Sequence, residues 1–222
     1  MDTNPLSRIT HTTQGADPAR RDPAVRAIGI VLLIGVAIIG VTCLIVQFLR
    51  TDLDWTDVSL SLYVRGPYGP FVQASFFAPA PGIAALGFAW RRALERRARS
   101  TIALVMFAIA GTALCVMAAN VAKAGSQPAT VHGQIHLWAA FAAFVFVSTA
   151  MLVQSVKLRL DAHWHVRFPV LVTIASVAVV FFWTFALVKP IPRGLGEKVE
   201  IGVILLWLWL AAWWLVRDAQ SR

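Results

Sequence analysis

The chain has 222 residues, of which 58% are hydrophobic and only 14% are charged, and its mean hydropathy is +0.69. A soluble domain carries about a quarter charged residues, so this composition excludes an ordinary soluble domain and predicts long membrane-spanning segments. The formal charge of +9 at pH 7 does not indicate nucleic acid as a partner, because the basic residues lie beside apolar runs, where they orient a chain in the membrane.

The N-terminal segment, residues 1–24, is polar and holds two Asp-Pro pairs, so we predict a flexible cytoplasmic tail. The apolar run that follows, 27–49, is too long for the core of a signal peptide, and no small-residue cleavage site comes after it. We therefore expect this run to remain in the protein as its first membrane span.

Residues 50–70 form the longest predicted connection and end in the turn-rich sequence Gly-Pro-Tyr-Gly-Pro at 66–70. The second span, 71–90, holds Pro79 and Pro81 near its middle. Each proline removes a backbone donor, so we predict a kinked or locally opened helix there.

Four further apolar runs follow, separated by short polar loops. The predicted fold is all-α, a polytopic membrane protein with a bundle of six transmembrane helices in residues 25–217 and a cytoplasmic tail at 218–222. The predicted spans are 27–49, 71–90, 101–122, 134–156, 168–188 and 199–216.

The distribution of positive charge predicts the topology. With both termini inside, six of the twenty Lys and Arg residues fall on the outer side and the others on the inner side. This asymmetry predicts a multi-pass protein of the cytoplasmic membrane with cytoplasmic N- and C-termini. The six outer residues are Arg50, Arg65, Lys123, Lys189, Arg193 and Lys198.

Several residues of reactive or aromatic type are expected to have ordinary structural roles. Cys43 and Cys115 lie in apolar runs and are expected to be small buried hydrophobes. Asp161, His163 and His165 are expected to be solvated residues of a basic inner loop. The tryptophans of the last span are expected to form an aromatic belt and a packing face, and they are Trp207, Trp209, Trp213 and Trp214.

The first candidates for chemistry are His132 and His136, which are four residues apart, so that both rings can face the same way on a helix. No cofactor is firmly implied, but two imidazoles and a carboxylate of the outer side could hold a divalent metal and activate water. The alternative is that both histidines are interfacial polar residues that bond to carbonyls and headgroups. The candidate carboxylates are Asp52, Asp54, Asp57, Glu197 and Glu200.

Two acidic residues stand at the start of the last span. Glu197 is expected to satisfy the dipole of the helix in its first turn. Glu200 lies deeper, and an ionisable group inside a membrane is a functional candidate. Its expected partners are Lys123, Arg193 or His136.

Polar residues in the outer half of the spans predict a small outward-facing pocket. Gln73, Asn120 and Gln134 would lie there, near the helix opened by the two prolines. Membrane lipids are the expected partners of such a pocket.

Three local patterns also suggest a family. They are Ser59 with Gly-Pro-Tyr-Gly at 66–69 and Phe76; His-Gly-Gln-Ile-His at 132–136 with Ala139, Ala140 and Phe144; and Gly-Leu-Gly-Glu-Lys at 194–198 with Trp207. In this order the patterns resemble a family of six-span bacterial and archaeal membrane proteins labelled domain of unknown function 998. The resemblance covers about residues 28–216 and implies the six-span fold and a membrane location, but no activity.

The chain departs from the family pattern at two points. Lys198 stands where the family pattern has an arginine, and Lys-Ala-Gly-Ser at 123–126 stands where relatives often carry an acidic residue.

Three hypotheses of function follow. The first is a non-enzymatic membrane protein that binds a lipid or small ligand in the outward-facing polar pocket. The second is a metal-dependent hydrolase that uses the two histidines and an outer carboxylate, and the third is a small-solute transporter. The proposed ligand-binding residues are His132, His136, Asn120, Ser59, Glu197 and Glu200.

Overall fold

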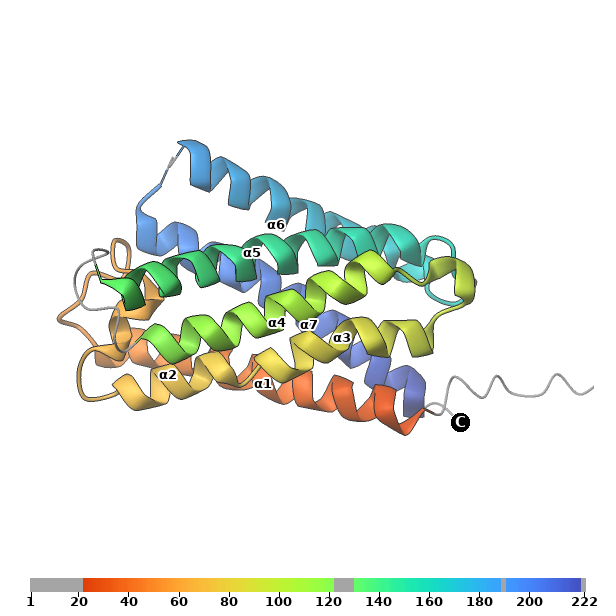
Figure 1. Cartoon of the computed structure of the whole chain (residues 1–222), viewed down its shortest axis with the longest axis horizontal. Helices are drawn as coiled ribbons and strands as arrows, with labels where there is room; N and C mark the ends of the chain where they lie inside the picture. The colour runs from red at the N-terminus through yellow and green to blue at the C-terminus, as the bar shows by residue number, and fades with distance from the viewer. Residues whose placement is uncertain (1–21, 122–129, 189–190, 221–222) are drawn as a thin grey trace, which may run out of the picture.

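A computed structural model describes residues 22–121, 130–188 and 191–220, and this part of the chain is all-α (Figure 1). The long helices are α1 (Pro23–Leu49), α2 (Gly69–Phe77), α3 (Ala80–Ala93), α4 (Thr101–Val121), α5 (Val131–Leu158), α6 (Phe168–Val188) and α7 (Arg193–Gln220). Three short 3₁₀ helices lie in the connections: η2 (Leu60–Val64), η3 (Arg96–Ala98) and η4 (His165–Arg167).

Six helical segments are long and apolar enough to cross a membrane, with α2 and α3 together forming the second. This confirms the predicted six spans, and the chain is a multi-pass membrane protein. Each span packs against its neighbours in sequence, and α7 packs against α1, so the six spans form a closed ring. Residues 1–21, which make up most of the predicted N-terminal tail, lie outside the described residues.

The second span is interrupted where the two prolines predicted it. Helix α2 ends at Phe77 and α3 begins at Ala80, because neither Pro79 nor Pro81 can donate a backbone hydrogen bond. Helix α1 packs closely against this break, and a Cβ added to Gly35 would lie 2.5 Å from the Ala78 carbonyl oxygen. The break is therefore covered by α1.

Helices α5 and α7 are among those that begin earlier than the hydropathy of the sequence predicted. Helix α5 begins at Val131, because the Thr130 hydroxyl caps it by accepting a hydrogen bond from the Gly133 N–H at 3.1 Å. Helix α7 begins at Arg193, six residues before the predicted start at 199. Its first turns are polar and pack on the loop at 50–68, which hydropathy alone does not show.

The core of the bundle is built from large aromatic side chains. Phe107 of α4 stacks on Trp207 of α7 with ring centroids 6.1 Å apart, and both side chains are fully buried. The Trp207 indole N–H donates to the Ser155 hydroxyl at 3.1 Å and to the Leu171 carbonyl at 3.0 Å. Trp207 therefore belongs to the predicted packing face and not to the predicted aromatic belt, because this ring fills the space between helices.

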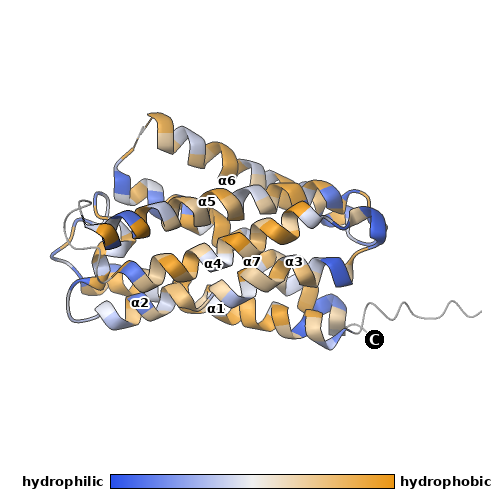
Figure 2. Cartoon of the chain, viewed as in Figure 1, coloured by the Kyte–Doolittle hydropathy of each residue, from blue (hydrophilic) through white to orange (hydrophobic). Residues whose placement is uncertain are grey.

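The two ends of the bundle are more polar than its middle (Figure 2). We call one the histidine end; it carries residues 50–68 and the starts of α5 and α7. We call the other the basic end; it carries η3, the loop at 159–167, the start of α1 and the end of α7 (Figure 1). A Cβ added to Gly29 would lie 3.2 Å from the Ala212 carbonyl oxygen, so the first turns of α1 meet the last turns of α7.

Candidate functional site

The two histidines tie the start of α5 to the end of α4. His132 Nδ1 lies 2.9 Å from Asn120 Oδ1, and His136 Nδ1 lies 3.1 Å from the Met117 carbonyl oxygen. Both partner oxygens are acceptors only, so each Nδ1 carries the proton, and Nε2 is the acceptor nitrogen of each neutral ring. The His132 side chain is exposed and His136 is half-buried. This pair fits the interfacial alternative, in which the histidines bond to carbonyl groups.

The second group of predicted residues joins α7 to the loop at 50–68. The Glu197 carboxylate accepts a hydrogen bond from the Leu60 backbone N–H, and Ser59 Oγ lies 3.2 Å from Ser61 Oγ. The Lys198 ammonium donates to the carbonyl oxygens of Trp55 and Val58, both at 2.7 Å. A single ammonium group therefore joins α7 to two carbonyls of this loop.

The glycine of the same motif allows close contact with this loop. A Cβ added to Gly194 would lie 2.5 Å from the Val58 carbonyl oxygen. The Leu195 N–H donates to the Thr56 carbonyl at 2.7 Å. The Gly-Leu-x-Glu-Lys motif therefore attaches the loop to α7.

Tyr63 of η2 lies next to this attachment, and the sequence indicated an interfacial residue where the structure has a buried one. Its side chain is fully buried, and its hydroxyl has no hydrogen-bond partner among the described residues. Burial raises the pKa of Tyr63. The Lys198 ammonium lies 5.5 Å from the centre of its ring.

Glu200 lies apart from both groups, between α7 and α5. It is 2% exposed, and its Oε1 accepts a hydrogen bond from the Ser148 hydroxyl at 3.3 Å. Three partners were expected for Glu200. Lys123 lies outside the described residues, and the hydrogen bond to Glu200 comes from Ser148 and not from Arg193 or His136.

The contacts thus sort the predicted residues into three places. They are the α4–α5 contact of His132, His136 and Asn120, the α7–loop contact of Ser59 and Glu197, and the α5–α7 contact of Glu200. Within residues 22–121, 130–188 and 191–220, no three His, Cys, Asp or Glu side chains come together as metal ligands. The metal-dependent hydrolase stays a prediction of the sequence.

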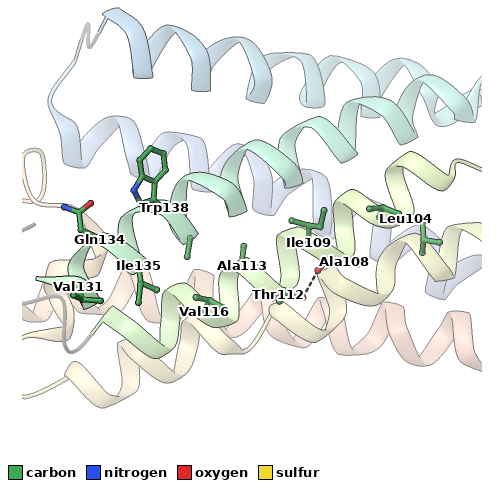
Figure 3. A pocket seen from close by; sticks show the side chains of 12 residues that line it. Leu104, Ala108, Ile109, Thr112, Ala113, Val116, Val131, Gln134, Ile135 and Trp138 are labelled. Carbon is green, nitrogen blue, oxygen red and sulfur yellow. Dashed lines mark hydrogen bonds between the residues drawn. The ribbon is translucent and has the colours of Figure 1, made fainter.

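A groove of about 970 Å³ runs between α4 and α5 (Figure 3). Its lining is almost entirely apolar, and Gln134 stands at one end of it, beside Val131. None of the six predicted ligand-binding residues lines this groove. The lining residues are Leu104, Val105, Ala108, Ile109, Thr112, Ala113, Val116, Val131, Gln134, Ile135, Trp138 and Ala139.

At the basic end, Asp161 is buried, which corrects the expectation of a solvated residue. It is 3% exposed, and its carboxylate accepts hydrogen bonds from the backbone N–H groups of Glu95, His163 and Trp164 at 2.9–3.0 Å. Aspartate in a turn often accepts hydrogen bonds from the backbone N–H groups two and three positions later, as Asp161 does here. This preference was the signal in the sequence that could have indicated its structural role.

His163 and His165 also have partners at this end. His163 Nε2 lies 2.7 Å from Asp218 Oδ2, and Arg167 donates to both oxygens of the same carboxylate. His165 Nδ1 lies 2.7 Å from the Ala162 carbonyl oxygen. The basic end is thus closed by links between the loop and α7.

Comparison with known proteins places the chain in a family. No curated protein and no solved structure matches the chain. A protein-family model described as "Protein of unknown function (DUF998)" matches residues 21–214, which is most of the chain. The chain therefore belongs to the DUF998 family of membrane proteins.

Proposed function

We propose that this protein binds a membrane lipid, with one acyl chain in the groove between α4 and α5. The observation that carries the proposal is the groove itself, which is apolar along its length and has an amide at one end (Figure 3). Both helices cross the membrane, and their exposed apolar side chains, such as Ile109 and Trp138, face lipid. Lipid acyl chains are therefore the molecules in direct contact with the opening of the groove.

The groove exists because small side chains line its floor. Ala108, Ala113 and Ala139 leave space that larger residues would fill. The Thr112 hydroxyl donates to the Ala108 carbonyl at 2.9 Å, so this polar group is satisfied within its own helix and presents no unpaired donor to an acyl chain. The floor can therefore accept an apolar ligand without loss of a hydrogen bond.

The length of the groove suits one acyl chain. The lining residues of α4 run from Leu104 to Val116, which corresponds to about 18 Å of helix at 1.5 Å per residue. One leaflet contributes about half of the roughly 30 Å of hydrocarbon in a bilayer. A single chain from one leaflet would therefore lie along most of the groove.

The polar end of the groove suits a headgroup. The Gln134 amide stands there, and the His132–Asn120 pair lies beside it at the start of α5. The contacts of His132 and His136 with α4 hold the two helices together at this end. We assign these histidines a positioning role for the groove.

We further propose that the basic end faces the cytoplasm, in the cytoplasmic membrane. The support is the excess of Lys and Arg in the segments that meet at this end, including Arg91, Arg92, Arg96 and Arg97. In this orientation Gln134 lies toward the outer leaflet, so the bound lipid comes from that leaflet.

Native mass spectrometry of the purified protein tests the proposal. In Ala108→Phe an aromatic ring fills the groove, and we expect the amount of co-purified lipid to fall about tenfold, which is 1.4 kcal/mol of binding free energy. Ala119→Phe is the matched control, because Ala119 is exposed on the same helix but does not line the groove. Equal lipid on both variants and the wild type would contradict the proposal.

The same measurement separates lipid binding from the metal-dependent hydrolase. A metal bound to the wild type and lost from a His132→Ala/His136→Ala variant would favour the hydrolase. We expect the metal content of that variant to equal that of the wild type. We also expect it to bind less lipid, because α4 and α5 lose two contacts at the headgroup end.

A further inference from the structure

We propose that Glu200 is a reversible proton-binding site inside the bundle, with the Ser148 hydroxyl as its hydrogen-bond partner. This inference is independent of lipid binding in the groove. It rests on the burial of the carboxyl group, on its incomplete hydrogen bonding and on its place within the membrane span.

The carboxyl group of Glu200 is removed from water and has one free oxygen. The residue is 2% exposed, and Oε2 has no hydrogen-bond partner among the described residues. The one donor to the other oxygen is the Ser148 hydroxyl, at a long distance of 3.3 Å. An ionised carboxylate requires several donors or a cation when it is buried, whereas a neutral carboxylic acid does not.

The site lies within two of the candidate membrane spans, 131–158 and 193–219. Ser148 is in the middle third of α5 (Val131–Leu158), and it is itself 2% exposed. An ionisable group at such a depth binds a proton or a cation, or lies on the path of one.

The helices around Glu200 supply no cation that would keep it ionised. Helix α6 has no charged residue, and α1 has only Arg26, which lies at the basic end. Helix α5 has His132 and His136 near its start, where both contact α4, and Lys157 near its other end. On α7, the nearest cation is Lys198, whose ammonium is taken up by two loop carbonyls.

The other titratable groups near the start of α7 do not pair with Glu200 either. Glu197 binds the Leu60 N–H, and Cys43 of α1 is a buried thiol. No ion pair among the described residues includes Glu200. A proton is therefore the ligand that completes the site.

Carbodiimide labelling tests this inference on the whole protein in liposomes. Dicyclohexylcarbodiimide takes the proton of a carboxylic acid while the carboxylate oxygen bonds to its central carbon, and the adduct rearranges to an acylurea that keeps the entire reagent. The apolar reagent reaches acids inside a membrane, and an ionised carboxylate does not react. We expect the peptide with Glu200 to gain the mass of the reagent.

The label should depend on pH, falling about tenfold for each pH unit above the point at which the acid ionises. Glu200→Gln should abolish the label, whereas Ser148→Ala and the control Glu197→Gln should retain it. Absence of label from the wild type, or label on Glu200 that does not change with pH, would overturn the inference. Protection by sodium at fixed pH would also overturn it, because a metal ion would then occupy the carboxylate.

Infrared spectroscopy of the wild type gives a second readout if a variant does not fold. A carbonyl stretching band of a buried carboxylic acid should be present in the wild type and absent in Glu200→Gln. In Ser148→Ala the band should shift, because the acid loses its hydrogen-bond donor. A wild-type spectrum without such a band would contradict a protonated Glu200.

Discussion

Asp161 illustrates at the scale of one residue how the basic end is held together. Its carboxylate joins the segment after α3 to the loop before α6 through three backbone N–H groups. We expect Asp161→Ala to lower the free energy of unfolding by about 2 kcal/mol, because three backbone donors, of which the Trp164 N–H is buried and the other two are partly buried, lose their acceptor. Unfolding in mixed detergent micelles measures this change.

Asp57→Ala is the matched control for this variant, because the Asp57 side chain is exposed in the other polar segment. We expect the control to change the free energy of unfolding by less than about 0.5 kcal/mol. Equal effects of the two substitutions would show that the three hydrogen bonds of Asp161 do not stabilise the fold.

Asp54 offers a pH-dependent test at the same scale. Hydrogen bonds from the Thr56 hydroxyl and from the Thr56 N–H, at 2.6 and 2.8 Å, hold the pKa of Asp54 below its usual range. Since the folded pKa is lowered, the stabilisation is present above the unfolded pKa of about 3.9 and is lost as the pH falls through the folded value. Hydrogen exchange of the Thr56 amide, corrected for its intrinsic rate, should therefore lose protection in acid.

The variant Asp54→Asn is the control for this experiment, because an amide oxygen accepts the same bonds and does not titrate. We expect protection in that variant to be independent of pH. If the protection of the Thr56 amide in the wild type stays the same down to the most acid pH at which the protein remains folded, Asp54 does not hold this amide.

The roles of individual residues were harder to predict than their environment. The sequence placed Asp161 in a polar loop and Trp207 in an apolar span, and both statements hold. Each also has a partner that is far away in sequence: the Asp161–Glu95 bond joins residues 66 positions apart, and the Trp207–Leu171 bond joins residues 36 apart. Hydropathy describes the neighbours along the chain and carries no information about such pairs.

At the scale of elements, the loop at 50–68 and the start of α7 behave as one unit. Lys198 donates to Trp55 and Val58, and Leu195 donates to Thr56. We expect Lys198→Met to speed hydrogen exchange of the loop amides by about tenfold or more, because bonds from a charged donor contribute about 1.5–3 kcal/mol. Mass spectrometry of the exchanged loop peptides measures this rate.

Two variants sharpen the test of Lys198. Lys198→Arg should keep the loop protected, since a guanidinium also donates to two carbonyls. Lys157→Met removes a lysine near the end of α5, away from the loop, and should leave its exchange unchanged. Rapid exchange in all three variants would mean that the ammonium does not hold the loop.

The break in the second span and the attachment of α7 differ in how well they could be predicted. Pro79 and Pro81 act on their own helix, so the break between Phe77 and Ala80 followed from the sequence. The early start of α7 at Arg193 depends on contacts with a loop more than a hundred residues earlier. The groove also depends on two helices together, since its floor of alanines lies on both α4 and α5.

At the scale of the molecule, topology is the property that the sequence predicts and the fold alone does not assign. In a chain with Cys43 and Cys115 replaced by serine, a cysteine at Arg97 should react with a membrane-impermeant maleimide only from the cytoplasmic side. A cysteine at Asp57 should react only from the outside. Both positions are exposed, at opposite ends of the bundle. The reverse pattern would invert the orientation and place the headgroup end of the groove in the inner leaflet.

Six spans and two polar ends could be anticipated from composition and charge, because both follow from the length of the apolar runs and the short loops between them. The closure of the bundle by contacts between α1 and α7 could not. The sequence analysis also predicted one polar pocket made by six residues. The structure divides these residues among three contacts and places an apolar groove beside one of them. The difference arises because polar side chains at helix ends found partners on neighbouring helices and loops.

The most direct test of lipid binding is a structure of the protein in a lipid nanodisc, determined by electron microscopy with a bound antibody fragment to add mass. We predict elongated density along Ala108 and Thr112, ending near Gln134, in the wild type and in Ala119→Phe. The density should be absent in Ala108→Phe. An empty groove in the wild type, or a second copy of the chain seated in it, would contradict the account.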